Sequence, residues 1–181
     1  TGGAGADTLV ASAGNDVVTG GAGNDTFSFT GTLLAANSGT TATFTGGAGT
    51  DKIDISTDAA TIVDADFRGI TTTETLTTGD GANSITLADN ADAAGITSVT
   101  GGAAVDTIDV SDVDFDNAIT IDTQAGADVI TLSTSTDQVA TIHIDAGDGV
   151  VSSAQIFAGA NIAASDTITF SSGAALEITG F

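Results

Sequence analysis

Short runs of glycine that end in an aspartate recur along this chain, and they are the segments best suited to chemistry. Residues 2–10 read GGAGADTLV, residues 11–19 read ASAGNDVVT and residues 20–28 read GGAGNDTFS, so three nine-residue units follow one another directly. Glycine at the first, second and fourth positions permits positive φ and sharp turns in which carbonyl oxygens face inward. With a carboxylate beside those oxygens, each turn suits Ca²⁺, which prefers oxygen ligands.

The sixth residue of each unit is the candidate carboxylate ligand. A fourth clear unit starts at residue 46, and looser units start at residues 78, 101 and 123. The predicted metal-site residues are Gly3, Gly5, Asp7, Gly14, Asp16, Gly21, Gly23, Asp25, Gly47, Gly49, Asp51, Asn83, Asp106 and Asp128. Asn83 carries no charge, so its turn is expected to be a weaker cation site. In the alternative interpretation, the glycines and aspartates form solenoid corners for steric reasons and bind no metal.

The first three units fit the pattern G-G-x-G-x-D-x-U-x, in which U is a large apolar residue, here Leu9, Val18 and Phe27. The chain therefore resembles the RTX family of haemolysin-type calcium-binding repeats. The resemblance implies a β-roll in which two nonapeptides form one coil of roughly 18 residues. It also implies Ca²⁺ ions between the turns of successive coils, shared by Asp7 with Asp25, by Asp25 with Asp51 and by Asp106 with Asp128.

In such a roll Asp7 and Asp25 lie on one edge and Asp16 lies on the opposite edge. The sixth-position residues are then separated by 9, 9, 26, 32, 23 and 22 residues, so the coils lengthen after Asp25. If each later coil carries one motif, the sixth-position residues other than Asp16 form a single column along one edge, from Asp7 to Asp128.

Strands must hold these turns in place. Between the turns, apolar residues alternate along the chain, as they do in strands with one buried face. Two pairs in each of the later coils mark inward strand positions: Ile85 with Leu87, Ile96 with Val99, Ile108 with Val110, Ile119 with Ile121, Ile130 with Leu132, and Ile142 with Ile144. The predicted fold is all-β, a parallel β-solenoid (RTX β-roll) whose coils lengthen from roughly 18 to about 22 or more residues.

Three segments are expected within one continuous solenoid. Residues 1–28 form a short-coil RTX β-roll, residues 29–149 continue it with longer coils, and residues 150–181 form degenerate terminal coils that serve as a cap or an assembly interface. Residues 30–45 and 59–76 break the pattern and are interpreted as enlarged coils or loops. The acidic connectors that hold Asp89, Asp92, Asp112, Asp114, Asp116 and Asp137 form either a solvated rim or a second row of ion sites.

Composition narrows the function. The chain has 24 acidic and 2 basic residues, a net charge of -22, and 41% hydrophobic residues, so it is expected to fold but to need cations. Nucleic acid is excluded as a partner because only Lys52 and Arg68 could contact phosphates. No apolar run is long enough for direct membrane insertion. There is no cysteine, and the one histidine, His143, is expected to point outward, so we do not expect an enzyme.

The sequence most resembles RTX proteins in which the solenoid itself is the functional body. It predicts a secreted, calcium-binding structural module of a bacterial surface layer or extracellular filament, which folds and assembles on binding several Ca²⁺ ions outside the cell. The expected location is the extracellular face of a bacterial cell, with self-association into a lattice or filament and a cell-surface polysaccharide as a further candidate partner. The alternative is the RTX repeat domain of a larger type I-secreted enzyme, toxin or adhesin.

Overall fold

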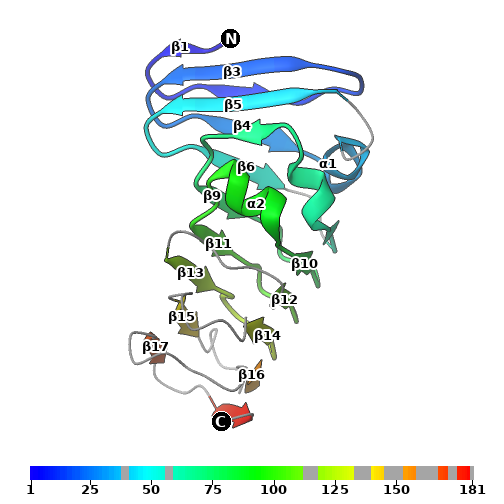
Figure 1. Cartoon of the computed structure of the whole chain (residues 1–181). Helices are drawn as coiled ribbons and strands as arrows, with labels where there is room; N and C mark the ends of the chain where they lie inside the picture. The colour runs from blue at the N-terminus through cyan, green and yellow to red at the C-terminus, as the bar shows by residue number, and fades with distance from the viewer. Residues whose placement is uncertain are drawn as a thin grey trace.

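The computed structural model of the chain is a stack of coils built from parallel strands, with the two termini at opposite ends of the stack (Figure 1). It describes residues 1–37, 41–55, 59–111, 118–132, 140–144, 153–157, 167–170 and 175–179. The strands of this described part form three sheets of four, six and eight strands. The predicted all-β parallel solenoid is therefore confirmed.

The eight-stranded sheet, called sheet B, runs along the whole stack. Its strands are β2 (Thr8–Val10), β4 (Thr26–Phe29), β6 (Lys52–Ile55), β9 (Thr75–Thr77), β11 (Ser98–Thr100), β13 (Ile119–Asp122), β15 (Ala140–Ile144) and β17 (Thr167–Phe170). Hydrogen bonds between the turns of successive coils join residues 18, 26, 23 and 22 positions apart, so the expected lengthening of the coils is confirmed.

The second wall of the solenoid changes from one sheet to another along the stack. Sheet A contains β1 (Gly3–Ala4), β3 (Val17–Ala22), β5 (Thr43–Ala48) and β8 (Ile70–Thr71). Sheet C contains β7 (Thr61–Ile62), β10 (Ser84–Thr86), β12 (Thr107–Val110), β14 (Val129–Leu132), β16 (Ser153–Phe157) and β18 (Ala175–Thr179). Both sheets are present only in the coil that holds β7 and β8, so the cross-section changes there.

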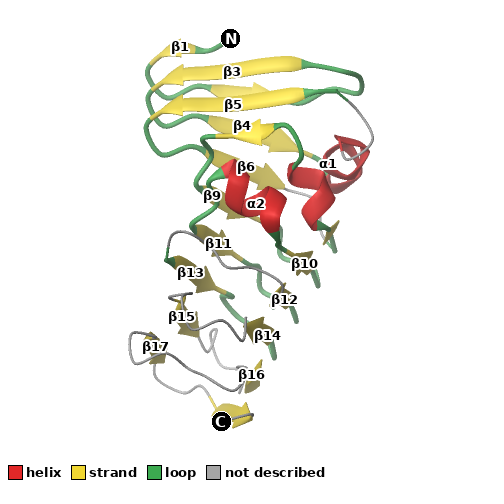
Figure 2. Cartoon of the chain, viewed as in Figure 1, coloured by secondary structure: helices red, strands yellow, loops and turns green. Residues whose placement is uncertain are grey.

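Three short helical segments lie at this change: α1 (Gly31–Asn37), the 3-10 helix η1 (Asp64–Phe67) and α2 (Asp89–Ala94) (Figure 2). Helix α1 contacts β7, the end strand of sheet C, and α2 contacts β8, the end strand of sheet A. An end strand exposes unpaired backbone groups, and a covering helix protects them. The sequence analysis expected enlarged coils in residues 30–45 and 59–76 but did not predict these helices.

The core follows the predicted alternation. The inward residues Ile85, Leu87, Ile108, Val110, Ile119, Ile121 and Ile130 are all buried. In the wider first coils phenylalanines fill the interior, and the ring of Phe44 meets those of Phe27 and Phe29 edge-on at 6.0 and 4.8 Å between centroids. Burial of each such side chain contributes about 1.5–3 kcal/mol. Among the described residues no helix is long and apolar enough to span a membrane.

Candidate metal centre

The first three sixth-position aspartates of sheet B form a ladder, called here the first column: Asp7, Asp25 and Asp51. Each is the last residue before a strand of sheet B. The backbone N–H of Asp7 donates to Asp25 Oδ1 at 2.8 Å, and the N–H of Asp25 donates to Asp51 Oδ1 at 2.7 Å. The structure therefore brings together the pairs Asp7 with Asp25 and Asp25 with Asp51, as the sequence predicts.

In two aspartates of the first column, one carboxylate oxygen has no hydrogen-bond partner. Asp25 Oδ2 and Asp51 Oδ2 are both buried, in residues that are 1% and 0% exposed, and neither has a hydrogen-bond partner within the described part of the chain. A buried charged oxygen without a partner is strongly unfavourable, because it has lost water and gained nothing. A cation beside these two atoms would offset that cost.

The turns beside these carboxylates are built from glycines that stack closely from coil to coil. Gly3, Gly21 and Gly47 stack in register, with φ of 142°, 126° and 119°. A Cβ on Gly21 would collide with the carbonyl oxygen of Gly3, and one on Gly47 would collide with that of Gly21. Gly5, Gly23 and Gly49 stack in the same way, with φ of 112°, 121° and 141°.

The glycine at the first motif position has a different role from the one expected. Gly2, Gly20 and Gly46 are absent from the described residues with positive φ. A Cβ on each would instead collide with Oδ2 of the aspartate in its own turn, at Asp7, Asp25 and Asp51. The expectation of positive φ at this position is wrong, and the physical reason for glycine is the close approach of the carboxylate.

These features fit Ca²⁺. The described residues contain no group of three or more acidic or histidine side chains that could hold a metal ion. A cation at the first column would need backbone carbonyl oxygens as ligands in addition to the carboxylates. Ca²⁺ accepts six to eight oxygen ligands of both kinds in flexible geometry, whereas Mg²⁺ demands a compact octahedron. The first column and its glycine turns would hold the ion, which would supply positive charge beside the unpartnered oxygens.

Sequence reasoning missed one member of this ladder, Glu74. Its Oε2 accepts the N–H of Asp51 at 2.7 Å, and its own N–H donates to the carbonyl oxygen of Asp51 at 3.0 Å. Glu74 is the residue before β9, so it holds the place that aspartate holds in the earlier coils. Gly69 is at the first motif position before it, but Ile70 and Thr72 replace the second and fourth glycines, which hides the motif. Its spacing of 23 residues from Asp51 matches the length of the later coils.

Asn83, Asp106 and Asp128 form a separate second column. Each is the residue before a strand of sheet C, not of sheet B. The N–H of Asn83 donates to Asp106 Oδ1 and the N–H of Asp106 donates to Asp128 Oδ1, both at 2.8 Å, so the pair of Asp106 and Asp128 is brought together as predicted. The coil before Asn83 contributes the N–H of Ala60, which donates to Asn83 Oδ1 at 3.0 Å.

The expected single column from Asp7 to Asp128 is therefore wrong. The neighbour of Asp51 is Glu74, and the neighbours of Asn83 are Ala60 and Asp106. The gap of 32 residues between Asp51 and Asn83 is longer than the 23-residue coil because the motif moves from the amino ends of the sheet B strands to the amino ends of the sheet C strands.

The electrostatics of the second column differ from those of the first. Oδ2 of Asp106 accepts the N–H of Gly102 at 2.8 Å, so both oxygens of this buried carboxylate have partners. Burial raises the pKa of Asp128 from 3.8 to about 6, and the hydrogen bond from the N–H of Asp106 opposes that rise.

Asp16 and Gly14 lie on the opposite edge of the first coils, in the turn between β2 and β3, as predicted. Asp16 Oδ2 accepts the hydroxyl of Ser12 at 2.7 Å. From the described part of the next coil, the N–H of Thr41 donates to Asn15 Oδ1 and the N–H of Thr43 donates to the carbonyl oxygen of Asp16. Asp89 and Asp92 lie on α2. The remaining connector aspartates named above, Asp112, Asp114, Asp116 and Asp137, lie outside the described residues.

Comparison with known proteins agrees with the N-terminal geometry. Residues 1–30 match the family model of the RTX calcium-binding nonapeptide repeat, which represents four copies of the repeat. No curated protein and no solved structure matches the chain. The matched segment contains Asp16 and the first two aspartates of the first column, Asp7 and Asp25. Residues 1–30 therefore carry RTX calcium-binding nonapeptide repeats.

Proposed function

We propose that this chain is a secreted structural module of a bacterial surface layer or extracellular filament, which folds and assembles when it binds Ca²⁺ outside the cell. The observation that carries the proposal is the pair of buried, unpartnered oxygens, Asp25 Oδ2 and Asp51 Oδ2, in a glycine-built stack of turns. A chain that carries this cost without calcium is stabilised when calcium is supplied.

The electrostatics of the whole chain support a folding step that depends on calcium. A net charge of -22 resists compaction, and bound divalent cations offset it. For extracellular modules with Kd of ~0.1–1 mM, free Ca²⁺ of about 1 mM contributes roughly 0.4–1.4 kcal/mol per site. Cytosolic calcium lies far below this range. The chain is therefore expected to stay unfolded before export and to fold at the cell surface.

The solenoid itself supports a structural role over an enzymatic one. The carboxylates of both columns accept backbone N–H groups of the neighbouring coil, so they hold successive coils together, as a structural role requires. Self-association is part of this proposal, because bound Ca²⁺ can bridge acidic faces that would otherwise repel one another. A cell-surface polysaccharide is a further candidate partner.

Isothermal titration of the chelator-treated chain with calcium, combined with light scattering, tests the proposal. We expect several ions per chain and scattering that rises as they bind. Asp25→Ala should lower the number of ions and the thermal midpoint, whereas Asp89→Ala, which removes an exposed carboxylate, should change neither. Equal effects of the two substitutions would contradict a calcium site at the first column.

The alternative function is the RTX repeat domain of a larger type I-secreted enzyme, toxin or adhesin, in which the repeats drive export and folding. Scattering separates the two. A chain that folds on calcium and remains monomeric at high concentration would favour the repeat domain of a larger protein, whereas calcium-dependent growth of large particles supports the lattice or filament.

A further inference from the structure

The turn formed by residues 78–83 has glycine at the second and fourth motif positions, Thr78 at the first, and an asparagine in place of the aspartate. We propose that the side-chain amide of Asn83 takes the place of the calcium ion in this turn, so that the turn closes without metal. The inference rests on the proposed function, because it concerns which turns of a calcium-binding module are loaded.

Three oxygens surround the amide nitrogen of Asn83. Nδ2 donates to the carbonyl oxygens of Gly79 at 2.9 Å and Gly81 at 2.6 Å, and to Asp106 Oδ1 at 2.9 Å. Gly79 and Gly81 are the second and fourth positions of the motif, and Asp106 is the carboxylate of the next coil. Two turn carbonyls and a carboxylate from an adjacent coil are the oxygen types that a calcium ion would use, and here an N–H donor holds them.

The other end of the side chain fixes the orientation of the amide. Asn83 Oδ1 accepts the N–H of Ala60 at 3.0 Å. Exchange of the two amide atoms would place an oxygen against three oxygens and an NH₂ group against an N–H donor. Asn83 is only 3% exposed, so water is a poor substitute for any of these partners.

The neighbouring carboxylate of Asp106 has a hydrogen-bond partner for each of its oxygens, so neither oxygen is left for a cation to satisfy. Asp106 Oδ1 accepts both the N–H and the Nδ2 of Asn83, and Asp106 Oδ2 accepts the N–H of Gly102. In the first column, by contrast, Oδ2 of Asp25 and of Asp51 has no partner. The two separate columns have the same pattern of backbone N–H groups donating to carboxylates. They differ in what fills the turn, which is a cation in the first column and the amide of Asn83 in the second.

Two reciprocal substitutions of nearly equal volume test this assignment. Asn83→Asp replaces the donor with a second carboxylate and should add one Ca²⁺ per chain at saturation, with a lower thermal midpoint than the wild type in chelator. Asp25→Asn should remove at least one ion. The ions are counted by calcium titration and by native mass spectrometry of the saturated chain.

The outcomes separate this inference from the proposed function. A wild-type chain that binds no calcium overturns both. A wild-type chain that binds calcium, together with an Asn83→Asp variant that binds the same number of ions, overturns the inference alone. If Asn83→Asp does not fold, Asn83→Ala provides the second test: it should be less stable but keep the wild-type number of ions, and the loss of one ion would show that Asn83 is a calcium ligand.

Discussion

At the scale of single residues, the candidate site depends on the close approach of the aspartate side chain to the first-position glycine of its own turn. The first-position glycine is required because Oδ2 of the aspartate in its own turn lies against its Cα. Sequence reasoning identified the glycine but gave it a conformational role. The steric role becomes visible only when the side chain of the sixth residue is placed, because the φ of this glycine is not in the left-handed region.

Gly20→Ala is predicted to disrupt the site from within. Its Cβ would collide with Asp25 Oδ2 and lie 2.7 Å from the carbonyl oxygen of Gly46. We expect a loss of about 1–3 kcal/mol in stability from overpacking and weaker calcium binding. Gly31→Ala is the matched control, since its Cβ would meet only the Cβ of Ala60 at 3.4 Å. Calcium titration and thermal unfolding measure both variants, and equal behaviour would contradict the steric role of Gly20.

Glu74→Gln tests whether the first column continues beyond Asp51. The glutamine keeps an oxygen that can accept the N–H of Asp51, so the coil should remain folded, but it removes the charge beside the unpartnered Asp51 Oδ2. We therefore expect weaker calcium binding with little change in the circular dichroism at saturating calcium. Asp89→Gln, at an exposed carboxylate, is the control. If Glu74→Gln binds calcium with unchanged affinity, Glu74 is not part of the calcium site and the first column stops at Asp51.

At the scale of secondary-structure elements, the change from sheet A to sheet C depends on the contact between η1 and α2. Asp64 Oδ1 accepts the N–H groups of Ala88 at 2.8 Å and Ala91 at 3.0 Å, and Asp64 Oδ2 accepts Nδ2 of Asn90 at 2.5 Å. Helix α2 ends at Gly95, whose φ of 100° suits the left-handed cap. A carboxylate of one coil thus caps the helix of the next.

Asp64→Ala is predicted to destabilise the solenoid where its cross-section changes. It leaves several N–H donors at the start of α2 without an acceptor, which costs about 1–3 kcal/mol. The free energy of unfolding in urea at saturating calcium measures the effect, and Asp89→Ala on the same helix is the control. A loss no greater than that of the control would show that the cap contributes nothing to the fold.

The pKa of Asp128 predicts a pH dependence of opposite sign to that of an ordinary carboxylate. Because its folded pKa of about 6 exceeds the usual 3.8, the folded chain binds the proton more tightly. Its contribution to stability is fully present below about pH 3.8 and is lost as the pH rises through about 6. Asp128→Asn keeps an oxygen for the N–H of Asp106, so it should raise the free energy of unfolding at pH 7 by about 1–3 kcal/mol.

Urea unfolding of Asp128→Asn across this pH range checks that sign. The wild type should lose stability relative to the variant between pH 4 and pH 7. A variant that is instead less stable than the wild type at pH 7 in calcium would mean that a cation holds the Asp128 carboxylate, as the RTX resemblance implies for the pair of Asp106 and Asp128.

The repeating elements were predictable from the sequence, and the exceptions to the repeat were not. Alternation at positions such as Ile108 and Val110 identifies the strands. The recurring glycine–aspartate motif identifies the neighbouring pairs Asp7 with Asp25 and Asp25 with Asp51. The glycine–aspartate pattern marks a turn without saying which edge it occupies, so the move from sheet B to sheet C between Asp51 and Asn83 was missed. The helices were missed because they are stabilised by contacts with neighbouring coils, as Asp64 shows for α2.

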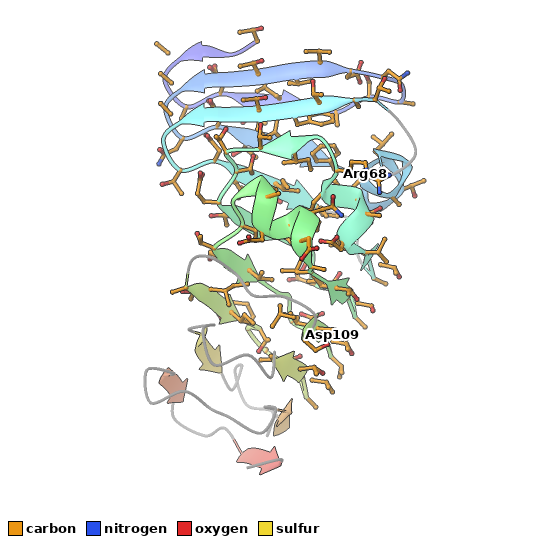
Figure 3. The ribbon with its side chains drawn as sticks, in the orientation of Figure 1. Arg68 and Asp109 are labelled. Atoms are coloured by element: carbon orange, nitrogen blue, oxygen red, sulfur yellow. The ribbon has the colours of Figure 1, made fainter. Side chains whose placement is uncertain are left out.

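At the scale of the whole molecule, the strong negative charge opposes the formation of a long stack of coils. Of the two basic residues, Lys52 forms an ion pair with Asp54 at 3.1 Å, and Arg68 lies beside the helical segments, far along the stack from Asp109 (Figure 3). Exposed ion pairs of this kind contribute little. The charge balance of the folded chain therefore depends on bound cations, and the first column is where the structure offers them buried oxygens.

Far-UV circular dichroism during a calcium titration of the chelator-treated chain tests the central claim most directly. We expect a disordered spectrum in chelator and a cooperative change to β structure as free Ca²⁺ approaches the millimolar range, with a higher midpoint concentration for Asp25→Ala. A full β spectrum in chelator that calcium leaves unchanged would contradict it, and would mean that the glycine–aspartate turns are metal-free corners of a solenoid that folds by packing alone.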